Sequence, residues 1–329
     1  MTTYENRIST VLERQPVVAL LSLAALILYG VWVATGIGAS DYQPAGLLPH
    51  AVETAGRSVI KSAVINISAV AISSLFLWMI NRWYYITHSY CRIYLGLYII
   101  GLASIPALWH GLSSGLIMCA VLLFCVIMLY SLYQRPGGTR RIFLVFCLIS
   151  VGSLYDFAYL GFAIPLMLAC GQMRCMSLRA VLAAGIGLIT PLWIGQGFGL
   201  IDLTKVGYPM LSIPTLSLLD EYPIPIQILM AAVVIITSVL TIVNTFTIYG
   251  HNAKTRANNG VLALMSLWSA LAIVIDFAHA LSYLPILIAL MSVQVALCFS
   301  LRRKGRGYIT VIVSILLFLS CAVWQMISI

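Results

Sequence analysis

Charged residues are scarce in this chain and stand almost entirely between long apolar runs. Of its 329 residues, 8% are charged and 62% are hydrophobic, whereas soluble domains carry about 25% charged residues. A chain of this length and composition cannot cover its own surface with polar groups in water. We therefore expect lipid to surround it, and we expect the few charges to orient it in the membrane.

Eleven apolar runs are long enough, or nearly so, to cross a bilayer, which needs about 20 helical residues. The sequence therefore predicts an all-α membrane protein whose spans are 17–37, 59–80, 93–108, 114–133, 142–155, 157–171, 180–200, 226–249, 260–275, 283–301 and 308–328. The first run is too long for the core of a signal peptide, so we interpret it as an uncleaved span. No other segment can fold in water alone, and residues 17–329 form one transmembrane domain in this interpretation.

The residues before the first span predict a short helix on the membrane surface. Tyr4, Ile8, Val11 and Leu12 fall on one helical face of the segment 1–16, and the charged residues lie elsewhere. An apolar face opposite a charged one is typical of a helix that lies in the lipid headgroups.

With eleven spans, the loops alternate in charge. Fifteen of the eighteen Lys and Arg residues fall on one side, namely Arg7, Arg14, Arg82, Arg92, Arg135, Arg140, Arg141, Arg174, Arg179, Lys254, Arg256, Arg302, Arg303, Lys304 and Arg306. Seven of the nine acids fall on the other side. Because basic loops stay in the cytoplasm, this alternation predicts that the N-terminus lies inside and the C-terminus outside.

The net charge of +9 does not indicate a nucleic-acid partner. The basic residues lie in short loops beside apolar spans, where they orient the chain and meet anionic headgroups. The partners that this pattern predicts are membrane lipids.

A short motif occurs twice, 120 residues apart. Asp156-Phe157-Ala158 precedes Pro165 by the same spacing with which Asp276-Phe277-Ala278 precedes Pro285. Each copy stands between two short spans, so spans four to seven and spans eight to eleven are predicted to repeat in the same orientation. Such repeats are frequent in transporters, with the site between the halves. They also occur in membrane enzymes and scaffolds.

The bends that contain these motifs are predicted to lie below the outer headgroups. The two spans in 142–171 must cross to the outer side and back within 30 residues. Each then has about fifteen helical residues, which extend only about 22 Å, whereas the hydrocarbon core is about 30 Å thick. The pairs around His110 and around Asp276 are similarly compact. Because a carboxylate at that depth needs water or a partner, we expect a polar depression that opens outward.

Asp156 and Asp276 are the first candidates for chemistry. Two outward carboxylates in equivalent bends suit a base, a metal ligand or a proton carrier. The alternative is that each is an N-cap of the helix that follows. His279 lies three residues after Asp276 and shares its helical face, so the pair could bind a cation or move a proton. For His279 and His110, the alternative is that the imidazole only places a polar group among the lipid headgroups and has no chemical role.

Three further residues are candidates to line the depression. Gln196 and Trp193 lie in span seven, which Pro191 should kink, and Asp41 lies in the outer loop 38–58. The glycines at 195, 197 and 199 permit either close helix approach or a frayed outer end. The alternative for the whole stretch is a tightly packed, kinked helix without a binding role.

The remaining polar and sulfur-bearing residues are predicted to be structural. Asn66 and Asn244 fall inside spans and should make interhelical hydrogen bonds. The eight cysteines show no CxxC spacing, so we interpret them as small apolar residues and expect no metal site. No Walker loop, GxSxG, HExxH or dinucleotide fingerprint occurs, and no cofactor is predicted.

Two stretches of the chain resemble a known family. The run from Ser153 to Leu160, SLYDFAYL, resembles the S-L-F-Y-D-W-A-like bend of multi-span inner-membrane proteins of Bacteroidota that are classed as a domain of unknown function. The run SYLPIL from Ser282 is similar to the family's later S-Y-P-I-L run, and span lengths agree over roughly residues 60–328. This chain carries Phe157 where the family pattern has Trp, and His110 near a bend that is acidic in the family. The resemblance implies a multi-span fold and an inner-membrane address, and it implies no catalytic residue.

Three functions are compatible with these features. The first is a non-catalytic subunit or scaffold of an envelope assembly, with the acids as caps and an envelope protein as partner. The second is an enzyme or handler of lipid-linked glycan or envelope precursors, similar to membrane glycosyltransferases that use polyprenyl-linked donors. The third is a transporter or flippase that works between the repeats, which the scarcity of charge within the spans disfavours.

Overall fold

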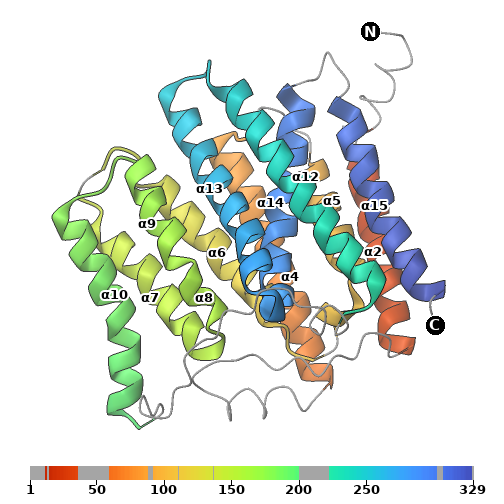
Figure 1. The fold of residues 1–329 in the computed structure, drawn as a ribbon, viewed down its shortest axis with the longest axis horizontal. Coiled ribbons are helices and arrows are strands. Elements are labelled where there is room, and N and C mark those ends of the chain that lie inside the picture. The colour runs from red at the N-terminus through yellow and green to blue at the C-terminus, as the bar shows by residue number, and fades with distance from the viewer. Residues whose placement is uncertain are drawn as a thin grey trace.

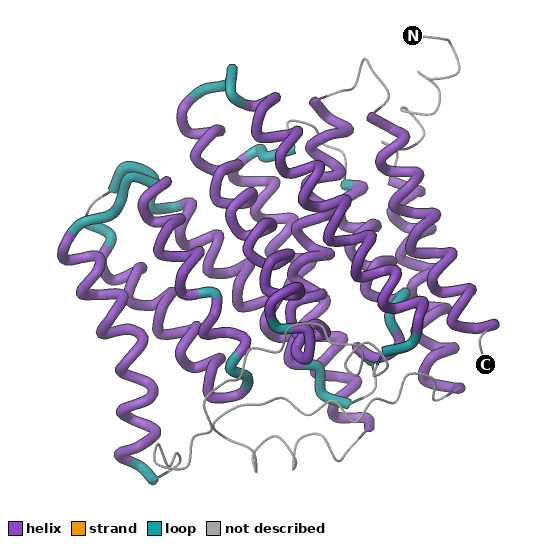
Figure 2. Tube along the Cα trace, viewed as in Figure 1, coloured by secondary structure: helices purple, strands orange, loops and turns teal. Residues whose placement is uncertain are grey.

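The fold is a bundle of helices that run up and down beside one another (Figures 1 and 2). The computed structural model describes residues 12, 15–35, 59–87, 92–109, 111–135, 137–199, 222–301 and 307–327, and these ranges contain helices and no strand. The prediction of an all-α protein is confirmed. The segment 1–16 lies almost wholly outside the described residues.

The helices correspond closely to the apolar runs. They are α2 (Gln15–Thr35), α4 (Val59–Tyr84), α5 (Ile93–Ala103), η1 (Pro106–Leu108), α6 (Ser114–Tyr130), α7 (Thr139–Tyr155), α8 (Ala158–Gly161), α9 (Ala163–Gln172), α10 (Leu178–Gly197), α12 (Ile224–Ile248), α13 (Ala253–Ile275), η2 (Phe277–His279), α14 (Ala280–Leu301) and α15 (Gly307–Ile327).

Seven helices of the described residues are long and apolar enough to cross a membrane. They are α2, α4, α10, α12, α13, α15 and the continuous rod of η2 and α14. The helices α5, α6 and the pair α8–α9 are apolar but shorter. A multi-pass membrane protein therefore follows from the structure. A count of eleven spans needs these three shorter units and also α7, and it is not confirmed.

Helix α14 lies at the centre of the bundle. It packs against α5, α6, α12, α13 and α15, and its residues from Ala280 to Phe299 are all buried. A helix that is hydrophobic on every side is typical of such a central position. Any polar group on α14 must therefore find its partner on a neighbouring helix.

The turns of the bundle divide between its two ends. The turns between α6 and α7, between α9 and α10 and between α12 and α13 lie at one end, and the corners between α7 and α8 and between α13 and α14 lie at the opposite end (Figure 1). The first set of turns and the helix starts that follow them carry Arg and Lys residues. We call these the basic end and the acid end of the bundle.

The predicted interhelical hydrogen bond is confirmed for Asn244, whereas Asn66 bonds mainly to the loop between η1 and α6. Asn66 of α4 donates from Nδ2 to the carbonyl oxygen of Gly111 at 2.8 Å and accepts from the backbone N–H of Ser113 at 3.2 Å. Asn244 of α12 donates from Nδ2 to the Oε1 atom of Gln294 in α14 at 2.8 Å. The two amides thus bind segments that are distant in the sequence.

Helix α10 approaches α7 closely at Gly187 rather than at the glycines that the sequence suggested. A Cβ at Gly187 would lie 2.6 Å from the carbonyl oxygen of Phe143, whereas nothing lies within 4 Å of a Cβ at Gly197 or Gly199. At these last two positions the helix simply ends, and Gly199 has a positive φ of 67°. Pro191 is buried inside α10, as expected for a tightly packed helix.

The predicted repeat is seen at its two corners but not in the packing of its last helices. Each Asp-Phe-Ala motif follows the end of a helix and leads into a short helical turn. The equivalent final helices have different neighbours, because α10 packs along α7 whereas α15 packs on α14, α12 and α5. The four-helix repeat therefore stays a prediction.

The contact at Gly187 can be tested with matched alanine substitutions. We expect Gly187→Ala to lower the melting temperature of the purified protein, because overpacking of this kind costs about 1–3 kcal/mol. Gly185→Ala should be neutral or stabilising, because no atom lies within 4 Å of the added Cβ. Equal melting temperatures for the two variants would contradict the close α7–α10 contact.

Candidate functional site: an acid cluster on the first turns of α14

The two Asp-Phe-Ala corners have the same local construction. Helix α7 ends at Tyr155, and Asp156 then adopts an extended backbone with φ −149° and ψ 125°. Helix α13 ends at Ile275, and Asp276 leaves the helical region with φ −125° and ψ 70°. In each case an aspartate occupies the first non-helical position, so its side chain can turn away from its own helix.

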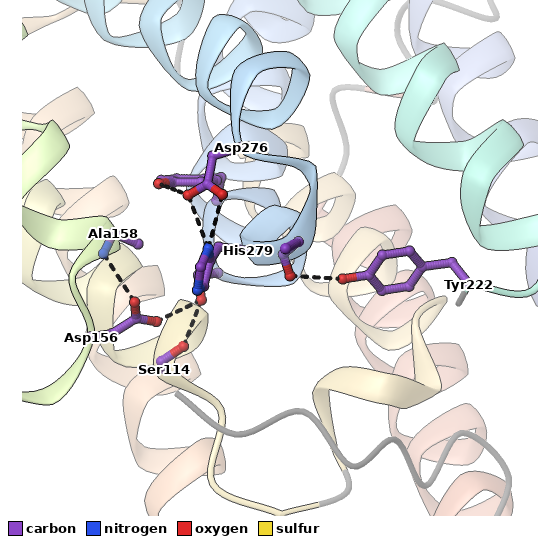
Figure 3. Close-up of polar contacts among 9 residues, drawn as sticks. Ser114, Asp156, Ala158, Tyr222, Asp276 and His279 are labelled. Carbon is purple, nitrogen blue, oxygen red and sulfur yellow. Dashed lines mark hydrogen bonds and ion pairs between the residues drawn. The ribbon is translucent and has the colours of Figure 1, made fainter. Parts of the chain in front are cut away.

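Asp156 is fully buried and binds three elements together. Its Oδ1 accepts the backbone N–H of Ala158 in α8 at 3.0 Å, and its Oδ2 accepts the hydroxyl of Ser282 in α14 at 2.7 Å (Figure 3). The Ser282 hydroxyl lies 2.7 Å from that of Ser114 at the start of α6. Because Ser282 gives its proton to the carboxylate, Ser114 must be the donor in the second bond.

Asp276 forms a dyad with His279. The His279 Nδ1 atom lies 2.9 Å from Oδ1 and 3.0 Å from Oδ2 of Asp276, and the hydroxyl of Tyr283 donates to Oδ2 at 3.0 Å. A carboxylate only accepts, so Nδ1 carries a proton. The His279 side chain is 22% exposed, and that of Asp276 is 12% exposed.

The two corners converge on one place. Figure 3 draws His279 between Asp276 and Asp156. Ser282 and Tyr283, which donate to Asp156 and Asp276 respectively, are consecutive residues of α14. The first turns of this central helix therefore satisfy both acids. We call Ser114, Asp156, Asp276, His279, Ser282 and Tyr283 the acid cluster.

The cap interpretation is correct for one aspartate and wrong for the other. Asp156 accepts a backbone N–H two residues ahead, at Ala158, as a capping side chain does. The carboxylate of Asp276 makes no capping bond to η2 and binds His279 and Tyr283 instead. Asp276 and His279 interact as their spacing of three residues suggested, although Asp276 itself lies at a non-helical position.

Sequence reasoning missed the residues that hold the acids. Ser114, Ser282 and Tyr283 were not selected, although Tyr283 follows Asp276 by seven residues, which is about two helical turns. Tyr222 was also missed, and its hydroxyl donates to the carbonyl oxygen of Ala278 at 3.1 Å (Figure 3). Helical spacing from Asp276 could have indicated Tyr283, whereas the long-range partner Ser114 leaves no signal in the sequence.

The candidates for lining a depression are not brought into the acid cluster. Trp193 is 75% exposed, and Gln196 is exposed near the end of α10, a helix that packs on α7. Asp41 and His110 lie outside the described residues. Of the candidate residues that the sequence indicated, the acid cluster contains Asp156, Asp276 and His279.

The sulfur and metal chemistry of the described residues is limited. Six cysteines there are buried free thiols and Cys147 is half-buried, so they pack as small apolar residues do. Within the same ranges, no group of three or more His, Cys, Asp or Glu side chains lies close enough together to hold a metal ion.

Comparisons with known proteins do not add to this geometry. No protein-family model, no curated protein and no solved structure matches the chain.

The Ser282–Asp156 bond can be tested by removing its donor. We expect Ser282→Ala to lower the melting temperature, because a buried carboxylate that loses a partner costs about 1–3 kcal/mol or more. Ser292→Ala is the matched control, since this buried hydroxyl of the same helix bonds only to the Ala289 carbonyl oxygen. A control variant that is destabilised as much as Ser282→Ala would contradict the role assigned to Ser282.

Proposed function

We propose that this chain is a non-catalytic subunit or scaffold of an assembly in the bacterial cell envelope. The acid cluster carries the proposal, because every carboxylate oxygen of Asp156 and Asp276 accepts a hydrogen bond from the protein itself. Asp156 is fully buried, so its charge is used to join α6, α8 and α14. Carboxylates committed in this way stabilise corners of a bundle rather than act on a substrate.

The topology of this proposal has eleven spans, with the basic end in the cytoplasm and the acid end outside. Two observations support it. The helices alternate in direction through the bundle (Figure 1), and the described basic turns gather at one end. The resemblance to the inner-membrane family of Bacteroidota agrees with the same address, and the partners in this view are membrane lipids and an envelope protein.

A second candidate function is supported by the dyad. His279 is held by Asp276 through Nδ1 and is 22% exposed, so its Nε2 could accept or deliver a proton. An enzyme acting on polyprenyl-linked precursors at the outer face would use such a group beside the membrane surface. Within the described residues, the dyad is the part of the acid cluster that such an enzyme would use.

Conservative substitutions in the dyad separate the two functions. Asp276→Asn and His279→Asn keep hydrogen-bonding side chains but cannot move a proton. The scaffold proposal expects both variants to restore the phenotype of a deletion strain and to co-purify with the same stoichiometric partner as the wild type. Loss of complementation with unchanged protein level and melting temperature would favour the enzyme.

The orientation can be tested by labelling single cysteines in a cysteine-free background. Lys61 is exposed at the acid end, and Asn252 lies in the turn before α13 at the basic end. We expect a membrane-impermeant thiol reagent to label Lys61→Cys in intact cells and Asn252→Cys only after permeabilisation. The reverse pattern would overturn the proposed topology.

A further inference from the structure

A second polar region lies inside the bundle, away from the acid cluster. Thr237, Thr241 and Asn244 of α12, Asn259 and Ser266 of α13, and Gln294 of α14 are all buried. These three helices pack against one another in every pairing. We call these six residues the polar seam.

Three of the six residues of the polar seam lie on one face of α12. Thr237, Thr241 and Asn244 are spaced by four and three residues, which places them on one helical face. Asn244 donates from Nδ2 to both Oε1 and the backbone oxygen of Gln294, at 2.8 and 2.9 Å. That face therefore meets α14. Asn259 and Ser266 are seven residues apart, so they too share one face of their helix.

Most polar atoms of the seam lack a protein partner. In the described part of the chain, no hydrogen bond is made by Thr237 Oγ1, Thr241 Oγ1, Ser266 Oγ, Asn259 Oδ1 or Gln294 Nε2. This is not the usual behaviour of hydroxyls on α12, because Thr245 and Thr247 bond to carbonyl oxygens four residues back. Thr237 and Thr241 forgo that local bond, which indicates that their hydroxyls are directed to another partner.

The chemistry of the seam suits water better than a cation. Asn259 Oδ1 can only accept a hydrogen bond, whereas Gln294 Nε2 can only donate one. A cation would satisfy the oxygens but would be repelled by the amide N–H groups. Water both donates and accepts, and buried water typically makes about three hydrogen bonds to otherwise unsatisfied groups.

The seam begins at the basic end and stops before the acid cluster. Asn259 lies in the second turn of α13 and retains 4% exposure, whereas Thr237 and Ser266 are fully buried at 0%. Beyond Thr237, the buried face of α12 continues with the apolar residues Val233 and Met230. The polar part of the seam therefore lies toward the basic end, and the same face of α12 is apolar beyond mid-bundle.

We propose that the polar seam binds buried water molecules between the basic end and the middle of the bundle. The water bonds Thr237, Thr241, Ser266, Asn259 and Gln294, and so stabilises the packing of α12, α13 and α14. This proposal is independent of the function assigned to the acid cluster.

The sign of a stability change tests the proposal. Thr237→Val and Thr241→Val preserve side-chain shape and remove one hydroxyl. If water binds these hydroxyls, each variant melts at a lower temperature than the wild type, because the water loses a partner. If the seam is dry, each variant melts at a higher temperature, because an unsatisfied buried group has been removed.

Radiolytic footprinting provides a second readout that does not depend on stability. Thr241→Cys and Val233→Cys place equally buried thiols on α12 in a cysteine-free background, since the parent residues are 1% and 0% exposed. X-ray radiolysis generates hydroxyl radicals from bound water, so the thiol of the Thr241→Cys variant should oxidise at least several-fold faster than that of the Val233→Cys variant. Equal rates, or a higher melting temperature for both valine variants, would overturn the proposal.

Discussion

Hydrocarbon cannot hydrogen-bond a carboxylate, and this constraint governs the architecture around α14. A charge at bilayer depth costs at least about 2.5 kcal/mol, so a buried aspartate persists only where the protein supplies donors. Ser282 and Tyr283 supply them to Asp156 and Asp276 from adjacent positions on one helix. The corner of α7 and α8 and the corner of α13 and α14 are thereby brought to the same place.

The central position of α14 follows from the same reasoning. In a helix that is buried on all sides, each polar side chain needs a hydrogen-bond partner on a neighbouring helix. These hydrogen bonds then determine which helices pack around α14. Ser282 reaches Asp156 and Ser114 at the acid end. Gln294 accepts from Asn244 further along. These polar contacts, at the acid end and further along α14, fix the register in which the apolar helices pack. Dispersion forces alone would specify that register only weakly.

Apolar periodicity and length were enough to predict the helices, because a run of this hydrophobicity has few other structures open to it in lipid. The corner aspartates were also found, since the repeated Asp-Phe-Ala motif stands out among apolar residues. The pairing of Asp276 with His279 followed from helical spacing. The role of Asn244 followed from its being an amide inside a span.

Other features depend on contacts between distant segments and could not be predicted. Ser114 and Ser282 form a hydrogen bond although they are 168 residues apart. Nothing in the sequence around them distinguishes these two serines from other serines whose hydroxyls bond to their own helix. Gly187 rather than Gly197 marks the close approach to α7, because the rotation of α10 about its axis decides which glycine faces inward. The cap alternative for Asp276 could not be excluded from the sequence, because its partner Tyr283 lies beyond the short range over which capping patterns are read.

The central claim is that the two Asp-Phe-Ala corners form one interacting cluster, and a double-mutant cycle between them tests it most directly. Asp156→Asn and His279→Asn would be made singly and together, and the unfolding free energies compared in one lipid environment. We predict a coupling energy of at least about 0.5 kcal/mol, as residues in one network show. Additive effects would mean that the corners are independent, and would contradict the claim.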